Sequence, residues 1–259
     1  MFLSRSLAGR LLLTALVAVG IGASAAELTP PGLILRQGEW RGDVGSFSVP
    51  EALVTVPASR WPMDAWVVLM IDTQAATLSI RPLVEGEARQ LLKPVLSQVL
   101  IAQKAADADW ANYSPIEPGT DLFVRVPGLR WKPGTVALHR FRNGTPVLVP
   151  ELGHRIQLQL GSLPYAFTVQ NGFRTADGRP YGSGTQFKLE IEGQVYEYDL
   201  GGYGWEVSIQ ALGDFDGDGR PDFLFAVGGS NSSHDALVLS SQARPGRNPP
   251  TAYLTAMGC

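Results

Sequence analysis

Hydrophobic positions in this chain come in short runs, many of which alternate with polar residues. Glycine and proline separate these runs, with 29 glycines and 19 prolines in the sequence. A period of two between apolar residues is typical of β-strands that bury one face. The pattern predicts strands over residues 65–71, 77–82, 121–126, 135–141, 156–160 and 165–170.

The clearest predicted hairpin is the segment FKLEIEGQVYEYDL, residues 187–200. Phe187, Leu189 and Ile191 alternate with polar residues before Glu192-Gly193, and a second alternating run follows. A glycine-containing break between two such runs is typical of a tight turn. We therefore expect two antiparallel strands with one buried face.

One segment, residues 87–106, has the spacing of a helix instead, because Leu92, Leu96 and Val99 recur near one face. Proline is tolerated at the start of a helix, so its regular part is expected to begin at Pro94. The predicted fold class is therefore mainly β, with antiparallel sheets of a sandwich-like or partial-propeller-like arrangement and one helix near 87–106.

The N-terminal residues have the pattern of a secretory signal peptide, predicted over 1–25. Arg5 and Arg10 precede an apolar run that closes on Ala23-Ser24-Ala25. An uncleaved membrane anchor is the alternative, although the run is shorter than the roughly 20 residues that span a bilayer. The pattern predicts a periplasmic or extracellular protein with no stable membrane insertion after cleavage.

The remaining chain is expected to form two regions, 26–160 with the helix and 161–259 with the denser ribbon pattern. The 24 acidic residues outnumber the 21 lysines and arginines, and no basic stripe is visible, which argues against a nucleic-acid partner. The single cysteine, Cys259, has no internal partner for a disulfide.

Negative charge is concentrated in the stretch GDFDGDGRPDFLF, which contains the segment 214–222, called the aspartate loop below. Asp214, Asp216 and Asp218 are spaced two apart, and in an extended strand neighbours would stand about 6.6 Å from each other. Gly217 and Gly219 allow the positive φ angles that curl the backbone inward. The three carboxylates can therefore converge on one point.

Converging carboxylates require a counter-charge, because two of them about 4 Å apart repel by roughly 4 kcal/mol at an effective dielectric constant of about 20. Ca²⁺ fits best, since it accepts six to eight oxygen ligands at flexible angles. The expected ligands are the backbone carbonyl of Arg220 and the carboxylates of Asp214, Asp216, Asp218 and Asp222. An EF-hand is excluded, because it needs flanking helices and a glutamate at the twelfth position, where this chain has Phe225.

The stretch resembles the FG-GAP or VCBS repeat of integrin propellers and exported bacterial proteins. The resemblance implies that D-x-D-x-D-G-x-x-D joins two strands and binds calcium through the five residues just named. Propellers of this family carry several copies, whereas this chain shows one. The resemblance therefore implies the calcium loop and its strand context, and neither a propeller nor integrin-type adhesion.

Signals of catalysis in the sequence are weaker than the signal of the aspartate loop. The sequence has no G-x-S-x-G elbow, and the adjacent residues Ser233-His234-Asp235 cannot form a hydrolytic triad. The six tryptophans could line a sugar-binding groove, but core filling is the commoner explanation. We expect an exported calcium-binding module, structural or ligand-binding, with a protein or carbohydrate partner, rather than an enzyme. The alternative is a secreted hydrolase acting on polysaccharide or peptide.

Overall fold

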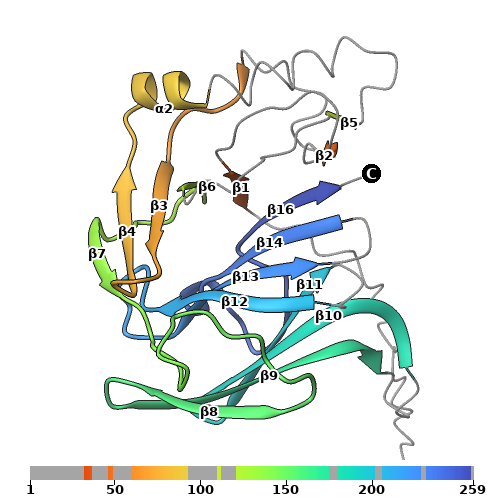
Figure 1. Cartoon of the computed structure of the whole chain (residues 1–259). Helices are drawn as coiled ribbons and strands as arrows, with labels where there is room; N and C mark the ends of the chain where they lie inside the picture. The colour runs from red at the N-terminus through yellow and green to blue at the C-terminus, as the bar shows by residue number, and fades with distance from the viewer. Residues whose placement is uncertain are drawn as a thin grey trace, which may run out of the picture.

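The residues that the structure, a computed structural model, describes form two β-sheets (Figure 1). The predicted mainly β class is therefore confirmed. The predicted signal peptide and Cys259 lie outside the residues that the structure describes. The structure describes residues 32–36, 46–48, 60–92, 110–111, 121–174, 180–201, 206–228 and 232–257.

Among the described residues, the large sheet has eleven strands, which are antiparallel except where β1 meets β16. Its two ends approach each other, because the backbone N–H of His139, just after β7, donates a hydrogen bond of 2.8 Å to the carbonyl of Leu212 in β12. The sheet is thus nearly closed. Its main path runs in the order β12 (Glu206–Gly213), β13 (Asp222–Gly228), β14 (Ser232–Val238), β16 (Ala252–Met257), β1 (Gly32–Arg36), β6 (Asp121–Arg125), β3 (Trp66–Asp72), β4 (Thr77–Pro82) and β7 (Gly134–Ala137), while β2 (Ser46–Ser48) pairs with β16 and with β5 (Trp110–Ala111).

The small sheet lies below the β12–β13 part of the large sheet in Figure 1. The predicted hairpin is confirmed as β10 and β11, with its turn at Glu192-Gly193. Both turn residues have positive φ, 51° and 77°. The order of the strands is β15 (Gly246–Asn248), β11 (Gln194–Gly201), β10 (Pro180–Ile191), β9 (Leu163–Arg174) and β8 (Arg155–Leu160).

Two hydrophobic cores meet at β13. Phe223 and Phe225 lie in the inter-sheet core, which the small sheet shares with β12–β14, and Phe187 of β10 lies with its ring centroid 4.8 Å from each of them. Leu224 points to the other face and belongs to the large-sheet core, which also includes residues of β1, β3, β4 and β6. Because both faces of β13 are buried, its sequence is a continuous apolar run and not an alternating one.

The predicted regions 26–160 and 161–259 both contribute strands to the large sheet. β1 runs parallel to β16, with Gly32 opposite Ala252. A Cβ atom at Gly32 would lie only 2.7 Å from the carbonyl oxygen of Thr251, so the absence of a side chain allows this close approach. The boundary near residue 160 itself stays a prediction.

The helix α2 spans Glu85–Leu91, so it begins two residues before the predicted range 87–106, and the predicted start of the regular part at Pro94 lies outside the described residues. Glu85 and Glu87 occupy its first turn, where the helix dipole favours acidic residues, and Arg89 pairs with Glu85 at 2.9 Å. Residues 93–106 of the predicted helix lie outside the described residues. Within the described part of the chain, no helix is long and apolar enough to cross a bilayer.

The predicted strand bounds are close for most elements, and β4 has the predicted bounds. The strand expected over 135–141 is too long, because β7 ends at Ala137. The backbone N–H of His139 donates a hydrogen bond to β12 instead of β4. The N–H of Phe141 donates a hydrogen bond of 2.9 Å to the carbonyl of Thr145, which closes a turn. Tertiary hydrogen bonds thus end a strand that its apolar pattern would have continued.

Candidate metal site

The aspartate loop joins β12 to β13, which are antiparallel, and Gly213 pairs with Asp222 where the strands meet. Strands flank the loop on both sides, as the repeat pattern predicts, which confirms that it is not an EF-hand. Gly217 and Gly219 have φ angles of 79° and 83°, the left-handed region that favours glycine. These two residues let the chain curl within a short connection.

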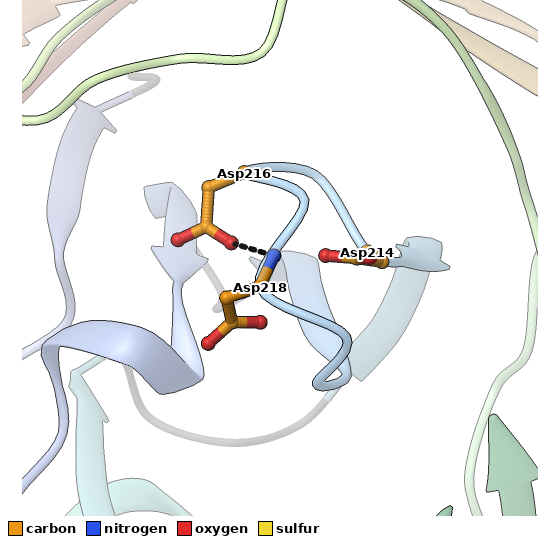
Figure 2. A group of neighbouring side chains, drawn as sticks. All are labelled: Asp214, Asp216 and Asp218. Carbon is orange, nitrogen blue, oxygen red and sulfur yellow. Dashed lines mark hydrogen bonds between the residues drawn. The ribbon is translucent and has the colours of Figure 1, made fainter. Parts of the chain in front are cut away.

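Three carboxylates come together inside this loop. Each of Asp214, Asp216 and Asp218 offers an oxygen, and the three oxygens lie within 4.8 Å of one another. Figure 2 shows the three side chains arranged around one space within the loop. The structure therefore has the convergence that the sequence spacing and the two glycines predict.

The loop's own backbone holds one oxygen of each carboxylate. Backbone N–H groups two to five residues later in the chain donate hydrogen bonds to these oxygens. The N–H of Asp218 donates to Asp216 at 3.3 Å, that of Gly219 to Asp214 at 3.1 Å and that of Arg220 to Asp218 at 2.8 Å. The first of these is drawn in Figure 2. The other oxygen of Asp214, Oδ1, is buried and has no hydrogen-bond partner. A buried, unpartnered carboxylate oxygen is costly, so this atom indicates a missing partner.

A second segment contacts the loop from η2 (Ser240–Gln242), a short 3₁₀-helix after β14. The hydroxyl of Ser241 donates a hydrogen bond to Oδ2 of Asp216. Sequence reasoning missed this residue, because only the folding of β14 against β13 brings it to the loop.

Asp222 has a different environment from the other three aspartates. It is fully buried, and its two oxygens accept hydrogen bonds from the backbone N–H groups of Phe215, at 2.7 Å, and Ser240, at 2.9 Å. It is not among the three converging residues. Burial, reinforced by the charge of Asp216, raises the pKa of Asp222 well above its ordinary value. Its role as a ligand stays a prediction, whereas its role as an acceptor for two buried amides is shown.

The guanidinium of Arg220 reaches away from the loop and donates to Glu192 Oε2 at 2.8 Å. This ion pair joins the aspartate loop to the β10–β11 turn of the small sheet. The backbone carbonyl of Arg220 as a calcium ligand stays a prediction.

The charges in the loop also act on Asp218. Burial and the negative charges of Asp216 and Asp214 raise the pKa of Asp218, although the N–H of Arg220 opposes the shift. The side chain of Lys132 also lies at the loop, with its Cδ and Nζ 2.6 Å and 3.5 Å from the position of a Cβ atom on Gly217. Among the described residues, Lys132 forms no ion pair with a carboxylate within 4.0 Å.

The chemistry of this donor set suits a hard cation. The converging atoms are all carboxylate oxygens, and neither histidine nor cysteine takes part. Hard oxygen donors in an adaptable loop match Ca²⁺ better than zinc or copper, which favour nitrogen and sulfur.

The other sequence candidates do not form a catalytic group in the described residues. Ser233, His234 and Asp235 are consecutive residues of β14, and the side chains of His234 and Asp235, as neighbours in a strand, point to opposite faces. His234 stacks on Tyr253 with ring centroids 5.3 Å apart, and burial lowers the pKa of its imidazole. Both observations fit an imidazole packed within the sheet.

The tryptophans that the structure describes with their side chains serve as core residues. Trp61 and Trp66 are buried, and Trp131 packs against the large-sheet core. For Trp61 and Trp66, core filling is confirmed, whereas Trp131 is only partly buried. Trp40 and Trp205 lie outside the described residues.

No family model, curated protein or solved structure matches the chain. The resemblance to the FG-GAP or VCBS repeat therefore stays a prediction carried by the loop residues themselves.

Proposed function

We propose that this is an exported β-rich protein that binds one structural Ca²⁺ in the aspartate loop and acts as a binding or structural module. The observation that carries the proposal is the convergence of three carboxylates beside a buried oxygen of Asp214 that lacks a partner. The N-terminal charge and apolar pattern supports export to the periplasm or beyond the cell.

Calcium is the proposed ion because the loop offers several hard oxygens in an irregular arrangement. Asp214, Asp216 and Asp218 would hold it, with the Arg220 carbonyl and Asp222 as the further ligands that the sequence predicts. When bound, the ion supplies the positive charge that three close carboxylates lack. The loop amides already fix one oxygen of each converging carboxylate, so little further ordering is needed on binding.

The proposed role is structural because of where the loop lies. It connects β12 to β13, and β13 is buried on both faces between the two cores. Holding this junction would fix the start of the strand on which both cores depend. The proposed ligand of this module is a protein or a carbohydrate.

The test is thermal unfolding in calcium and in chelator, with calorimetry for bound ion. At free calcium about 100 times the dissociation constant, the free energy of unfolding should rise by about 2.7 kcal/mol. Asp214→Asn should abolish the rise, whereas Glu151→Gln, which removes one charge from an exposed residue outside the loop, should keep it. An unchanged melting temperature together with no heat of calcium binding in the wild-type protein would refute the proposal.

A further inference from the structure

A trough of about 770 Å³ crosses one end of the small sheet. Its walls come from β8, β9, β10, the start of β11 and the Glu192-Gly193 turn. This volume is within the range of about 300–1,000 Å³ that is usual for small-molecule sites. None of the residues that line the trough belongs to the aspartate loop, although Glu192 of the lining pairs with Arg220 of that loop.

The register of the small sheet shows which face carries the trough. Gln157, Ala166, Glu190 and Val195 lie opposite one another across four strands, and all four line the trough. Residues directly opposite one another share a face of the sheet. Their neighbour Phe167, on the other face, lies in the inter-sheet core. The trough is therefore on the outer face of the sheet.

Its lining combines short apolar and long polar side chains. Pro164 is exposed and Val195 is half-buried, while Ala166 lies at the floor with 3% of its surface exposed, and Gln157 and Gln159 are exposed residues beside them on β8. Gln194 lines the trough from the start of β11. The result is a shallow apolar surface flanked by primary amides, each of which can donate and accept hydrogen bonds.

The charged residues of the trough are already paired. The guanidinium of Arg155 donates two hydrogen bonds to Glu190 Oε2, at 2.7 Å and 3.1 Å, and one to Oε1 at 3.2 Å. Glu192 accepts a bond from Arg220 at 2.8 Å. Because each carboxylate has an arginine partner, the trough offers polar contacts without a strong field of either sign.

We infer that this trough binds a neutral carbohydrate. A pyranose ring has apolar C–H faces and a rim of hydroxyl groups, which match the short apolar residues and the surrounding amides of the trough. Paired charges do not favour an anionic or cationic ligand. The inference goes beyond the calcium proposal and does not depend on it.

The experiment measures the binding of maltohexaose, cellohexaose and N-acetylchitotetraose to the full chain by saturation-transfer NMR and calorimetry. We expect at least one of the three to bind and to shift the backbone amide signals of Ala166 and Val195. The double variant Gln157→Ala/Gln159→Ala should weaken that binding by at least about ten-fold, since each amide contributes a hydrogen bond. Gln74→Ala, at an exposed position in the β3–β4 turn, is the matched control and should leave affinity unchanged.

Three results would overturn the inference. The first is no binding of any of the three sugars to wild-type protein. The second is binding that the double variant leaves intact or that shifts signals elsewhere. The third is a preference for polygalacturonate or for an extended peptide over all three neutral sugars. The mutated glutamines are exposed, so the variants should keep the melting temperature of the wild-type protein, which will show that they fold. The shifts of the backbone amide signals are measured on the wild-type protein and need no variant. Calcium binding, measured separately, is unaffected by any of these results.

Discussion

Two connections between antiparallel strands lie close together in this protein and reverse the direction of the chain in different ways. The β10–β11 turn reverses the chain with only Glu192 and Gly193, both at positive φ. The aspartate loop makes the same reversal between β12 and β13 with a longer segment that carries three converging carboxylates. A short turn needs only backbone freedom, whereas the longer loop also needs its charges balanced.

The two connections also differ in how deeply they are anchored. Arg220 and Glu192 link them through a partly exposed ion pair, which contributes little free energy. The aspartate loop has a second anchor, because Asp222 satisfies two buried amides, one within the loop and one in η2. The comparison therefore predicts large effects at Asp222 and small effects at the turn.

The largest expected effect comes from Asp222→Ala. The change leaves the buried N–H groups of Phe215 and Ser240 without an acceptor, which should lower the free energy of unfolding by about 3 kcal/mol. Asp222→Asn keeps one acceptor and should cost less. Glu192→Ala in the turn should cost at most about 0.5 kcal/mol. Urea unfolding measures all three, and equal losses for Asp222→Ala and Glu192→Ala would contradict the comparison.

The next largest expected effect is a rise in the free energy of unfolding when the protein is acidified in the presence of chelator. The pKa values of Asp218 and Asp222 are raised above the ordinary 3.8, so the folded state holds protons that the unfolded state has released. Their contribution to stability is therefore greatest in acid and is lost as pH rises through the raised values. Bound calcium should remove this trend, because it favours the charged carboxylates.

The measurement is urea unfolding at a series of pH values upward from the ordinary pKa of 3.8, with the wild-type protein compared with Asp218→Asn. The pH-dependent difference between the two proteins should be present in chelator and disappear in calcium. A difference of the same size in both conditions would show that the loop carboxylates do not respond to the ion.

Glycine substitutions separate backbone strain from calcium binding. Gly193→Ala and Gly219→Ala both place a side chain at positive φ, 77° and 83°, and neither Cβ meets a neighbour within 4 Å. Each should cost about 1 kcal/mol of stability. Only Gly219→Ala should also weaken calcium binding, because it distorts the loop. Calorimetry that finds the same loss of affinity for both variants would remove the distinction between turn and loop.

The smallest expected effect comes from Lys132, whose side chain lies over Gly217. Lys132→Met keeps an apolar stem there and removes a positive charge that competes with the cation. Calcium affinity should rise by about three-fold at low salt, and the gain should shrink as salt is added. Lys188→Met, on the small sheet, is the control. A fall in affinity for Lys132→Met would show that the lysine supports the loop instead of competing for it.

Local features of the fold could be predicted because they depend on neighbouring residues. The β4 bounds and the Glu192-Gly193 turn follow from alternation and from the needs of a tight turn. The position of the aspartate loop between two strands follows from its glycines and from the apolar run after it. The helix α2 begins at Glu85, two residues before the predicted range, where Glu85 and Glu87 give its first turn the acidic residues that the helix dipole favours.

The sequence by itself determined the strand pattern and the spacing that allows three aspartates to converge, since both are set within a few residues. Only the tertiary structure decided that Asp222 holds two buried amides, that Ser241 and Lys132 reach the loop, and that the outer face of the small sheet forms a trough. The physical reason is that these contacts join segments far apart in the chain. The pairing of the sheets, and not the local pattern, places them.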